Sequence, residues 1–356
     1  MAFTKASGYT NLNNGNFSPV IYSQKVQKTF RKSSVVEDVT NTDYFGEIAN
    51  FGDSVRIIKE PEITVSSYAR GTQLSTQDLT DADFSLIVDQ ANYFQFAIDD
   101  IEAAHSHVNF MDLATDRAAY RLRDAFDAEV LGYLAGWEDD GSGGWQRRTA
   151  ANGTKADSAA GADELLAANK LDITDFGGSD LGVASEVTSI PVAAGGGSNG
   201  VTSPLAILNR IARLMDQANV DTEGRWFVAD PVFYEILMDE NSKFISNDYA
   251  GGQDAGDILR NGRMSNGLVR GFRVYKSNNL PYEGTGAGTT LSTGSETNFG
   301  VVVAGHDSAV ATAQQIAKTE SFRDPNTFAD KVRGMQLYGR KILRPEALFT
   351  ANYNVA

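Results

Sequence analysis

FMDLATDRAAYRLRDAFDAEVLGYL, residues 110–134, carries the most regular pattern in this chain. Apolar and small side chains recur in it every three or four residues, which predicts an α-helix with one buried face. That face would hold Ala118, Leu122, Ala125, Phe126, Glu129, Val130 and Tyr133. The other side carries charges, including Arg123 and Asp127 at i,i+4 spacing, so we expect it to be solvated or to face a polar partner. At 1.5 Å per residue the helix would be about 37 Å long.

The sequence before this helix alternates between apolar and polar residues, as strands with one buried face do. One run holds Val55, Ile57, Ile63 and Val65, and a second holds Phe84, Leu86 and Val88. About twenty mostly polar residues separate the two runs. We therefore predict a long hairpin over residues 55–97. Because an isolated two-stranded hairpin is marginally stable in water, it should lie along another surface.

The first 36 residues contain no Asp or Glu but carry five basic side chains, whereas the whole chain has a formal charge of −15. Such a polar, Asn- and Gly-rich arm cannot bury a core of its own. We expect it to become ordered on another surface, and the most available acidic surface is a second copy of the chain. A solvated tail and a nucleic-acid-binding tail are the alternatives.

The second half of the chain reads as an α+β unit that follows a loop-rich stretch over residues 138–203. The run Gly195–Gly197 indicates a boundary. Ser203 and Pro204 then predict the start of a helix, as Asp230 and Pro231 do for a shorter helix through residue 238. Strands are expected at 226–229, 272–276 and 299–304. Alternation over 316–354 predicts long strands that return to the first half, with helix 110–134 packed beneath them.

Composition excludes several classes of protein. The chain has 356 residues, of which 42% are hydrophobic and 22% charged, as in ordinary globular proteins. The absence of cysteine excludes disulfides, thiolate metal sites and cysteine nucleophiles. The net negative charge argues against a general nucleic-acid-binding surface. We find no membrane segment and no secretory signal, so we expect synthesis in the cytoplasm.

Motifs for catalysis or metal binding are weak. His105 and His107 stand two residues apart, but the chain has no cysteine and its third histidine is distant in the sequence. The string from Gly305 to Ser308 contains His306 and Asp307, but triads are assembled from separate segments, so a turn and a helix cap are expected there. The glycine-rich loops complete no phosphate-binding pattern. We predict no catalytic, cofactor-binding or metal-binding residues, and no enzyme.

Taken together, the order of basic arm, long hairpin, long helix, α+β unit and returning strands resembles the major capsid proteins of tailed double-stranded DNA bacteriophages, which share the Hong Kong 97-like fold. The likeness covers nearly the whole chain. The stretches that carry it are FGDSVRIIKEPEITV at 51–65, GRWFVADPVFYEILMD at 224–239, GLVRGFRVYKSNNLP at 267–281, VVVAGHDSAVATAQQ at 301–315 and YGRKILRPEALFTAN at 338–352.

The resemblance implies an α+β fold in four parts. These are an N-terminal arm (1–50), an extended β-hairpin loop (51–98), a peripheral domain (99–200 and 316–356) with a spine helix at about 110–134, and an axial domain (201–315). It also implies contacts between subunits through the arm and the loop. The candidate contact residues are Phe17, Tyr22, Lys25, Lys28, Phe30, Arg31, Lys32, Lys59, Arg70, Asp78, Asp81 and Asp83.

The implied function is structural: copies assemble into pentamers and hexamers of an icosahedral head that encloses double-stranded DNA without reading its sequence. The implied partners are the protein itself, a separate scaffolding protein and a portal, with a decoration protein left open and no membrane. The location would be the virion, after assembly in the host cytoplasm. Some relatives form Lys–Asn links from the loop, but here the loop holds only Lys59, near its base, so we expect no covalent links.

Three other functions stay open at this point. A cellular nanocompartment shell would use the same fold around an enzyme cargo. A soluble acidic enzyme could use a carboxylate pair and would stay small in solution. A tail or surface-adhesion protein would form tubes or fibres rather than closed shells.

Overall fold

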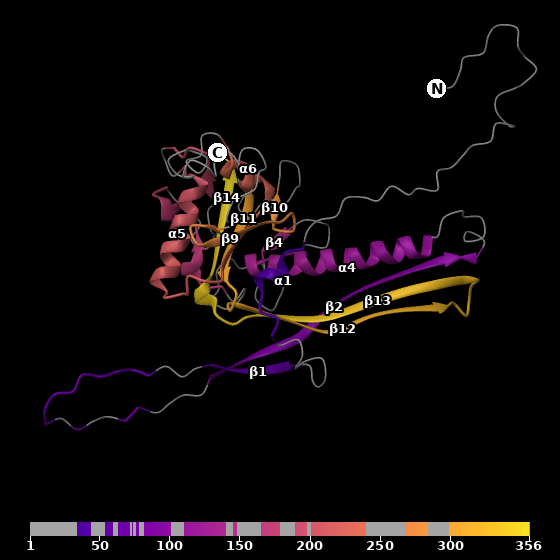
Figure 1. The fold of residues 1–356 in the computed structure, drawn as a ribbon, viewed down its shortest axis with the longest axis horizontal. Helices are drawn as coiled ribbons and strands as arrows, with labels where there is room; N and C mark the ends of the chain where they lie inside the picture. The colour runs from indigo at the N-terminus through magenta and orange to yellow at the C-terminus, as the bar shows by residue number, and fades with distance from the viewer. Residues whose placement is uncertain are drawn as a thin grey trace, which may run out of the picture.

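The computed structural model describes residues 34–43, 54–59, 63–71, 73, 76–77, 82–100, 110–139, 145–147, 165–178, 189–197, 201–239, 268–283 and 299–355. Two large sheets and one long helix organise these residues (Figure 1). A four-stranded sheet runs alongside the helix, and an eight-stranded sheet forms the body at one end. The predicted α+β class is confirmed.

Helix α4 spans Phe110–Ala135, close to the predicted range. Its C-terminal end, from Val130 onward, is buried on all sides rather than on one face. Of the two alternatives predicted for the charged side, solvation is wrong for Asp127, whose side chain is 0% exposed, and contact with polar partners is confirmed for it. Arg123 does not pair with Asp127 but with Glu37, at 2.7 Å. The reason is that the end of the helix is enclosed by segments distant in sequence, which helical periodicity does not reveal.

The four-stranded sheet has the order β1-β2-β13-β12, with antiparallel neighbours. Its strands are β1 (Ser54–Lys59), β2 (Ala82–Asp99), β12 (Val310–Arg323) and β13 (Ala329–Ile342). The prediction that long C-terminal strands return to the first half and pack on the helix is confirmed. Tyr338 of β13 meets Phe126 of α4 edge to face, with ring centroids 4.8 Å apart, and hydrogen-bonds Glu129.

The hairpin differs from its prediction. β1 pairs with residues 82–87 of β2 and ends at Lys59, so Ile63 and Val65 do not continue that strand. In the sequence, Pro61 separates the two pairs of apolar residues, and proline has no N–H to donate to a ladder. β2 instead runs on to Asp99, and its second part pairs with β13.

The eight-stranded sheet has the order β5-β14-β11-β7-β9-β8, with β10 beside β11 and β6 beside β14. Its strands are β5 (Lys170–Leu171), β6 (Ile190–Val192), β7 (Arg225–Ala229), β8 (Leu268–Val269), β9 (Phe272–Lys276), β10 (Tyr282–Glu283), β11 (Phe299–His306) and β14 (Leu348–Val355). The strands predicted at 226–229, 272–276 and 299–304 are confirmed.

Helices α5 (Pro204–Gln217) and α6 (Pro231–Leu237) pack on this sheet, and both predicted caps are present. Ser203 Oγ accepts from Ala206 N at 3.3 Å, and Asp230 Oδ2 accepts from Val232 N at 3.2 Å. Tyr353 Oη also donates to Asp230 Oδ1 at 2.6 Å. Burial raises the pKa of the Asp230 carboxyl. Cap and tyrosine therefore form one buried polar contact within an apolar core.

Residues 138–203 contain more regular structure than predicted. Besides β5 and β6, they hold the 3-10 helices η1 (Ala167–Asn169) and η2 (Ile173–Phe176) and the end of a small hairpin, β3 (Trp137–Asp139) with β4 (Trp145–Arg147). Asp172 caps η2 with a reciprocal bond to Asp175. β5 and β6 are fixed by pairing with β14, which lies more than 150 positions away in the sequence, and strands this short have no periodic signal of their own.

The last strand, β14, follows the 3-10 helix η3 (Pro345–Ala347) and pairs with β11. The C-terminal range 316–356 therefore contributes to both large sheets. The division into arm, loop, peripheral and axial domains stays a prediction.

Candidate functional site

No group of three or more His, Asp or Glu side chains in the described part of the chain could hold a metal ion. No helix among those residues is long and apolar enough to cross a membrane. His105 and His107 lie outside the described residues. The candidate functional sites described below are therefore exposed surfaces.

His306 and its neighbours fasten a turn between β11 and β12. Its Nε2 lies 2.8 Å from the carbonyl oxygen of Glu223, which can only accept, so Nε2 carries the proton. Nδ1 then accepts from the hydroxyl of Ser308, at 2.8 Å. Asp307 pairs with Arg273 rather than orienting the histidine. The predicted turn is confirmed, but no helix begins there, so the predicted helix cap is wrong.

Most of the predicted contact residues cannot be placed. Phe17, Tyr22, Lys25, Lys28, Phe30, Arg31, Lys32, Asp78 and Asp81 lie outside the described residues. Lys59 ends β1 opposite Ala82, and Asp83 of β2 lies opposite Ile58. Arg70 is exposed, in a turn. The assignment of all these residues to contacts between copies stays a prediction.

A first exposed apolar surface lies on the hairpin loop, by which we mean residues 54–59 and 63–71. It extends away from the rest of the molecule (Figure 1). Ile58, Ile63, Val65 and Tyr68 are 79%, 67%, 92% and 65% exposed. Large apolar side chains gathered on one projecting segment indicate a surface that contacts another molecule.

A second surface is the outer face of the four-stranded sheet, the face turned away from α4. Tyr93 of β2 is 80% exposed there, and Met335 of β13 lies directly opposite it. The guanidinium of Arg333 lies 5.0 Å from the ring centroid of Phe322 and bonds Glu320 at 2.8 Å. This face thus combines exposed apolar side chains with fixed charges, and the sequence analysis did not single it out.

A third surface is the hairpin tip, residues 323–330, which joins β12 to β13. Phe328 is 79% exposed there. Asp324 holds the turn by accepting from Asn326 N at 3.2 Å, Thr327 Oγ1 at 2.6 Å and Lys331 Nζ at 2.6 Å. These contacts, led by Lys331, lower the pKa of Asp324 to about 2. An exposed aromatic ring is thereby presented on a fixed turn; the turn-forming Asp324 and Pro325 in the sequence could have signalled it.

Comparison with solved structures gives the fold. A structure from Mycobacterium phage Che8 is 24% identical, with a TM-score of 0.66 over 94% of this chain and 97% of that one. The capsid structure of Cyanophage P-SCSP1u is 20% identical, with a TM-score of 0.63 over 100% of both chains. The capsid asymmetric unit of Cyanophage Pam1 is 14% identical, with a TM-score of 0.64 over 100% of both. No family model and no curated protein matches the chain. From end to end, the chain therefore has the fold found in these phage capsid structures.

Proposed function

We propose that this chain is the major capsid protein of a tailed bacteriophage. The observation that carries the proposal is the match in fold to capsid structures, which covers 100% of this chain and 100% of each of those chains. The label Hong Kong 97-like and the four-part division belong to the same proposal.

The exposed surfaces support a protein that works as an assembly. A hairpin loop with four large exposed apolar side chains lies at one place on the chain, and the outer face and the hairpin tip lie at others. Contact between different surfaces of identical copies is heterologous, and it closes into rings when the rotation between copies closes. Pentamers and hexamers are such rings. In this proposal the hairpin loop of one copy lies on its neighbour.

The finer features are part of the same proposal. The shell encloses double-stranded DNA without sequence recognition, which agrees with a net charge of −15. A separate scaffolding protein and a portal take part in assembly in the host cytoplasm, and the mature protein resides in the virion. The chain acts by association and not as an enzyme.

The test is negative-stain electron microscopy with light scattering on the expressed protein, alone and with a candidate scaffolding protein. Closed polyhedral particles or rings of five and six copies are expected. A monomer or dimer under both conditions would overturn the proposal, and tubes or fibres would favour a tail protein. Particles that enclose an enzyme cargo instead of DNA would favour a nanocompartment.

A pair of variants ties assembly to the hairpin loop. Val65→Asp combined with Tyr68→Asp places two charges on an apolar contact and should leave folded protein that does not form shells. The control is Leu166→Asp, which adds one negative charge, half the change of the loop variant, at a side chain that is 43% exposed beside the eight-stranded sheet. Circular dichroism confirms that each variant is folded. Equal shell yields for the loop variant and the control would contradict the role of the loop.

A further inference from the structure

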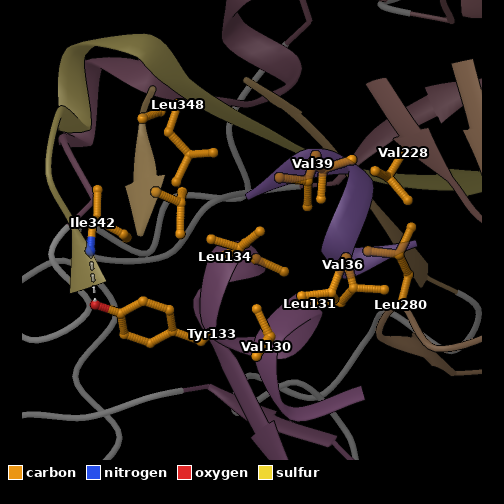
Figure 2. Close-up of a cluster of buried hydrophobic side chains, with 14 of the residues drawn as sticks. Val36, Val39, Val130, Leu131, Tyr133, Leu134, Val228, Leu280, Ile342 and Leu348 are labelled. Atoms are coloured by element: carbon orange, nitrogen blue, oxygen red, sulfur yellow. Dashed lines mark hydrogen bonds between the residues drawn. The ribbon is translucent and has the colours of Figure 1, made fainter. Parts of the chain in front are cut away.

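Residues 34–43, which we call the wedge segment, lie between α4 and the eight-stranded sheet. The segment contains the short helix α1 (Val36–Val39), whose Val36 and Val39 are 0% exposed. Figure 2 shows both valines among Leu131 and Leu134 of α4, Val228 of β7 and Leu280. These residues fall within the predicted N-terminal arm (1–50), and the expectation that the arm becomes ordered only on another surface is wrong for this segment, because it is buried within the same copy. Its apolar side chains help to form the core that joins helix and sheet.

Asp127 is the polar anchor of the wedge segment. Its Oδ1 accepts from Ser34 Oγ at 2.8 Å, from Val35 N at 2.8 Å and from Val36 N at 3.1 Å. Its Oδ2 accepts from Asn279 Nδ2 at 2.8 Å, which comes from the loop after β9. No ion pair joins Asp127 to a cation among the described residues. A buried carboxylate that has no cation beside it is stabilised by such hydrogen-bond donors. Asp127 therefore holds α4, the wedge segment and the loop after β9 together.

The other end of the wedge segment is fixed to the four-stranded sheet. Thr40 Oγ1 lies 3.0 Å from Thr312 Oγ1 of β12. Asn41 makes a parallel bridge on the edge of the same strand, with Asn41 N donating to Val310 O at 2.8 Å and Thr312 N donating to Asn41 O at 3.0 Å. Ten residues thus contact the long helix and both large sheets.

Among the described residues, two chain crossings between the two sheets lie side by side. One is the turn from β11 to β12, and the other leads from β13 to β14. Leu343 N and Arg344 N both donate to Ala309 O, at 2.8 and 3.1 Å, so the crossings are hydrogen-bonded to each other. Two adjacent crossings by themselves leave rotation about one line to be fixed by packing, and that packing comes from the buried end of α4 and from the wedge segment.

We infer that the wedge segment sets the angle between the two sheets and that Asp127 is the residue that positions it. Loss of the anchor frees this rotation while each sheet keeps its own ladder. Where the proposed function holds, the angle has a direct use, because closed rings of five and of six copies need different rotations between neighbouring copies. In the sequence the wedge segment directly follows the basic arm. The inference itself concerns a single copy.

The absence of native cysteine makes a distance measurement possible with two introduced thiols. Thr319→Cys on β12 and Glu235→Cys on α6 are both exposed and lie on the two different sheet bodies. Nitroxide labels at these sites, read by double electron–electron resonance on unassembled full-length protein, should give one narrow distance distribution. In the Asp127→Ala background the distribution should broaden to at least about twice its width or move to a new maximum.

The matched control is Asp172→Ala. Asp172 also accepts backbone N–H groups, from Thr174 at 2.9 Å and Asp175 at 3.4 Å, but it caps η2 away from the wedge segment. Its loss should leave the label distance unchanged. If Asp127→Ala does not fold, Ser34→Ala with Thr40→Val removes side-chain bonds at both ends of the wedge segment and keeps its buried valines.

A folded Asp127→Ala protein with the parental distance distribution would overturn the inference, even if shells form. Broadening that also appears in Asp172→Ala would overturn it as well, since the effect would then be general loosening. The two proposals can fail separately. If the distance distribution broadens only in Asp127→Ala while the parent protein never assembles, the inference about the wedge segment stands and the proposed function is refuted.

Discussion

Replacing Asp127 by alanine should destabilise the protein far more than replacing the half-buried helix cap Asp172. The substitution leaves Val35 N and Val36 N buried without an acceptor, while Ser34 is half-buried and can turn to water. Asn279 keeps a second acceptor, Asp124 Oδ1 at 3.1 Å. Each buried N–H left unpaired costs about 1–3 kcal/mol, and relief from burying a charge offsets part of this. We expect a net loss of about 2–4 kcal/mol.

The assay is urea unfolding of the unassembled protein, followed by circular dichroism, with the free energy of unfolding extrapolated to water. Asp172→Ala is the comparison, and it should lose about 1 kcal/mol, as typical caps do. A loss for Asp127→Ala no larger than that of Asp172→Ala would refute the reasoning, because it would mean that the wedge segment finds other partners at little cost.

Four other outcomes follow from the structure and the sequence. Gly305→Ala would put a Cβ 2.6 Å from Cζ2 of the buried Trp226, so it should cost about 1–3 kcal/mol in a thermal or urea melt. The pKa of Asp324 is lowered in the folded protein, so its carboxylate adds to the free energy of unfolding above about pH 4, and this addition is lost as the pH falls toward 2. The difference in free energy of unfolding between the parent protein and Asp324→Asn should therefore shrink over that range. Shells boiled in detergent should run as single chains, and a ladder of multimers would show covalent links. Reversing the charge of the arm should lower the yield of shells relative to the parent, and an unchanged yield would contradict docking of the arm on a neighbouring copy. The residues to change together to Glu are Lys25, Lys28, Arg31 and Lys32.

Elements with long local repeats were predictable from the sequence. The period of α4 depends on residues three and four positions apart, and the alternation of β13 on residues two positions apart. Both patterns can therefore be recognised in one sequence. The caps at Ser203 and Asp230 are equally local, because cap and first turn are neighbours. Alternation alone did not predict the end of β1, because the apolar pattern resumes at Ile63 and Val65, and only Pro61 between the two pairs signals the break.

The anchor at Asp127 shows why a candidate site can escape sequence reasoning. On the helix its position belongs with the charged side, and its donors come from residues about 90 positions before it and 152 after it. Burial of a carboxylate is decided by those donors and not by its neighbours on the helix. A signal was present nevertheless: Val35, Val36 and Val39 stand at offsets 0, 1 and 4, directly after the basic arm. Such a cluster predicts a short helical turn with one buried face. The segment from residue 34 to residue 43 therefore belongs to the body of the same copy, and an arm that becomes ordered on another surface stays a prediction for the residues before it.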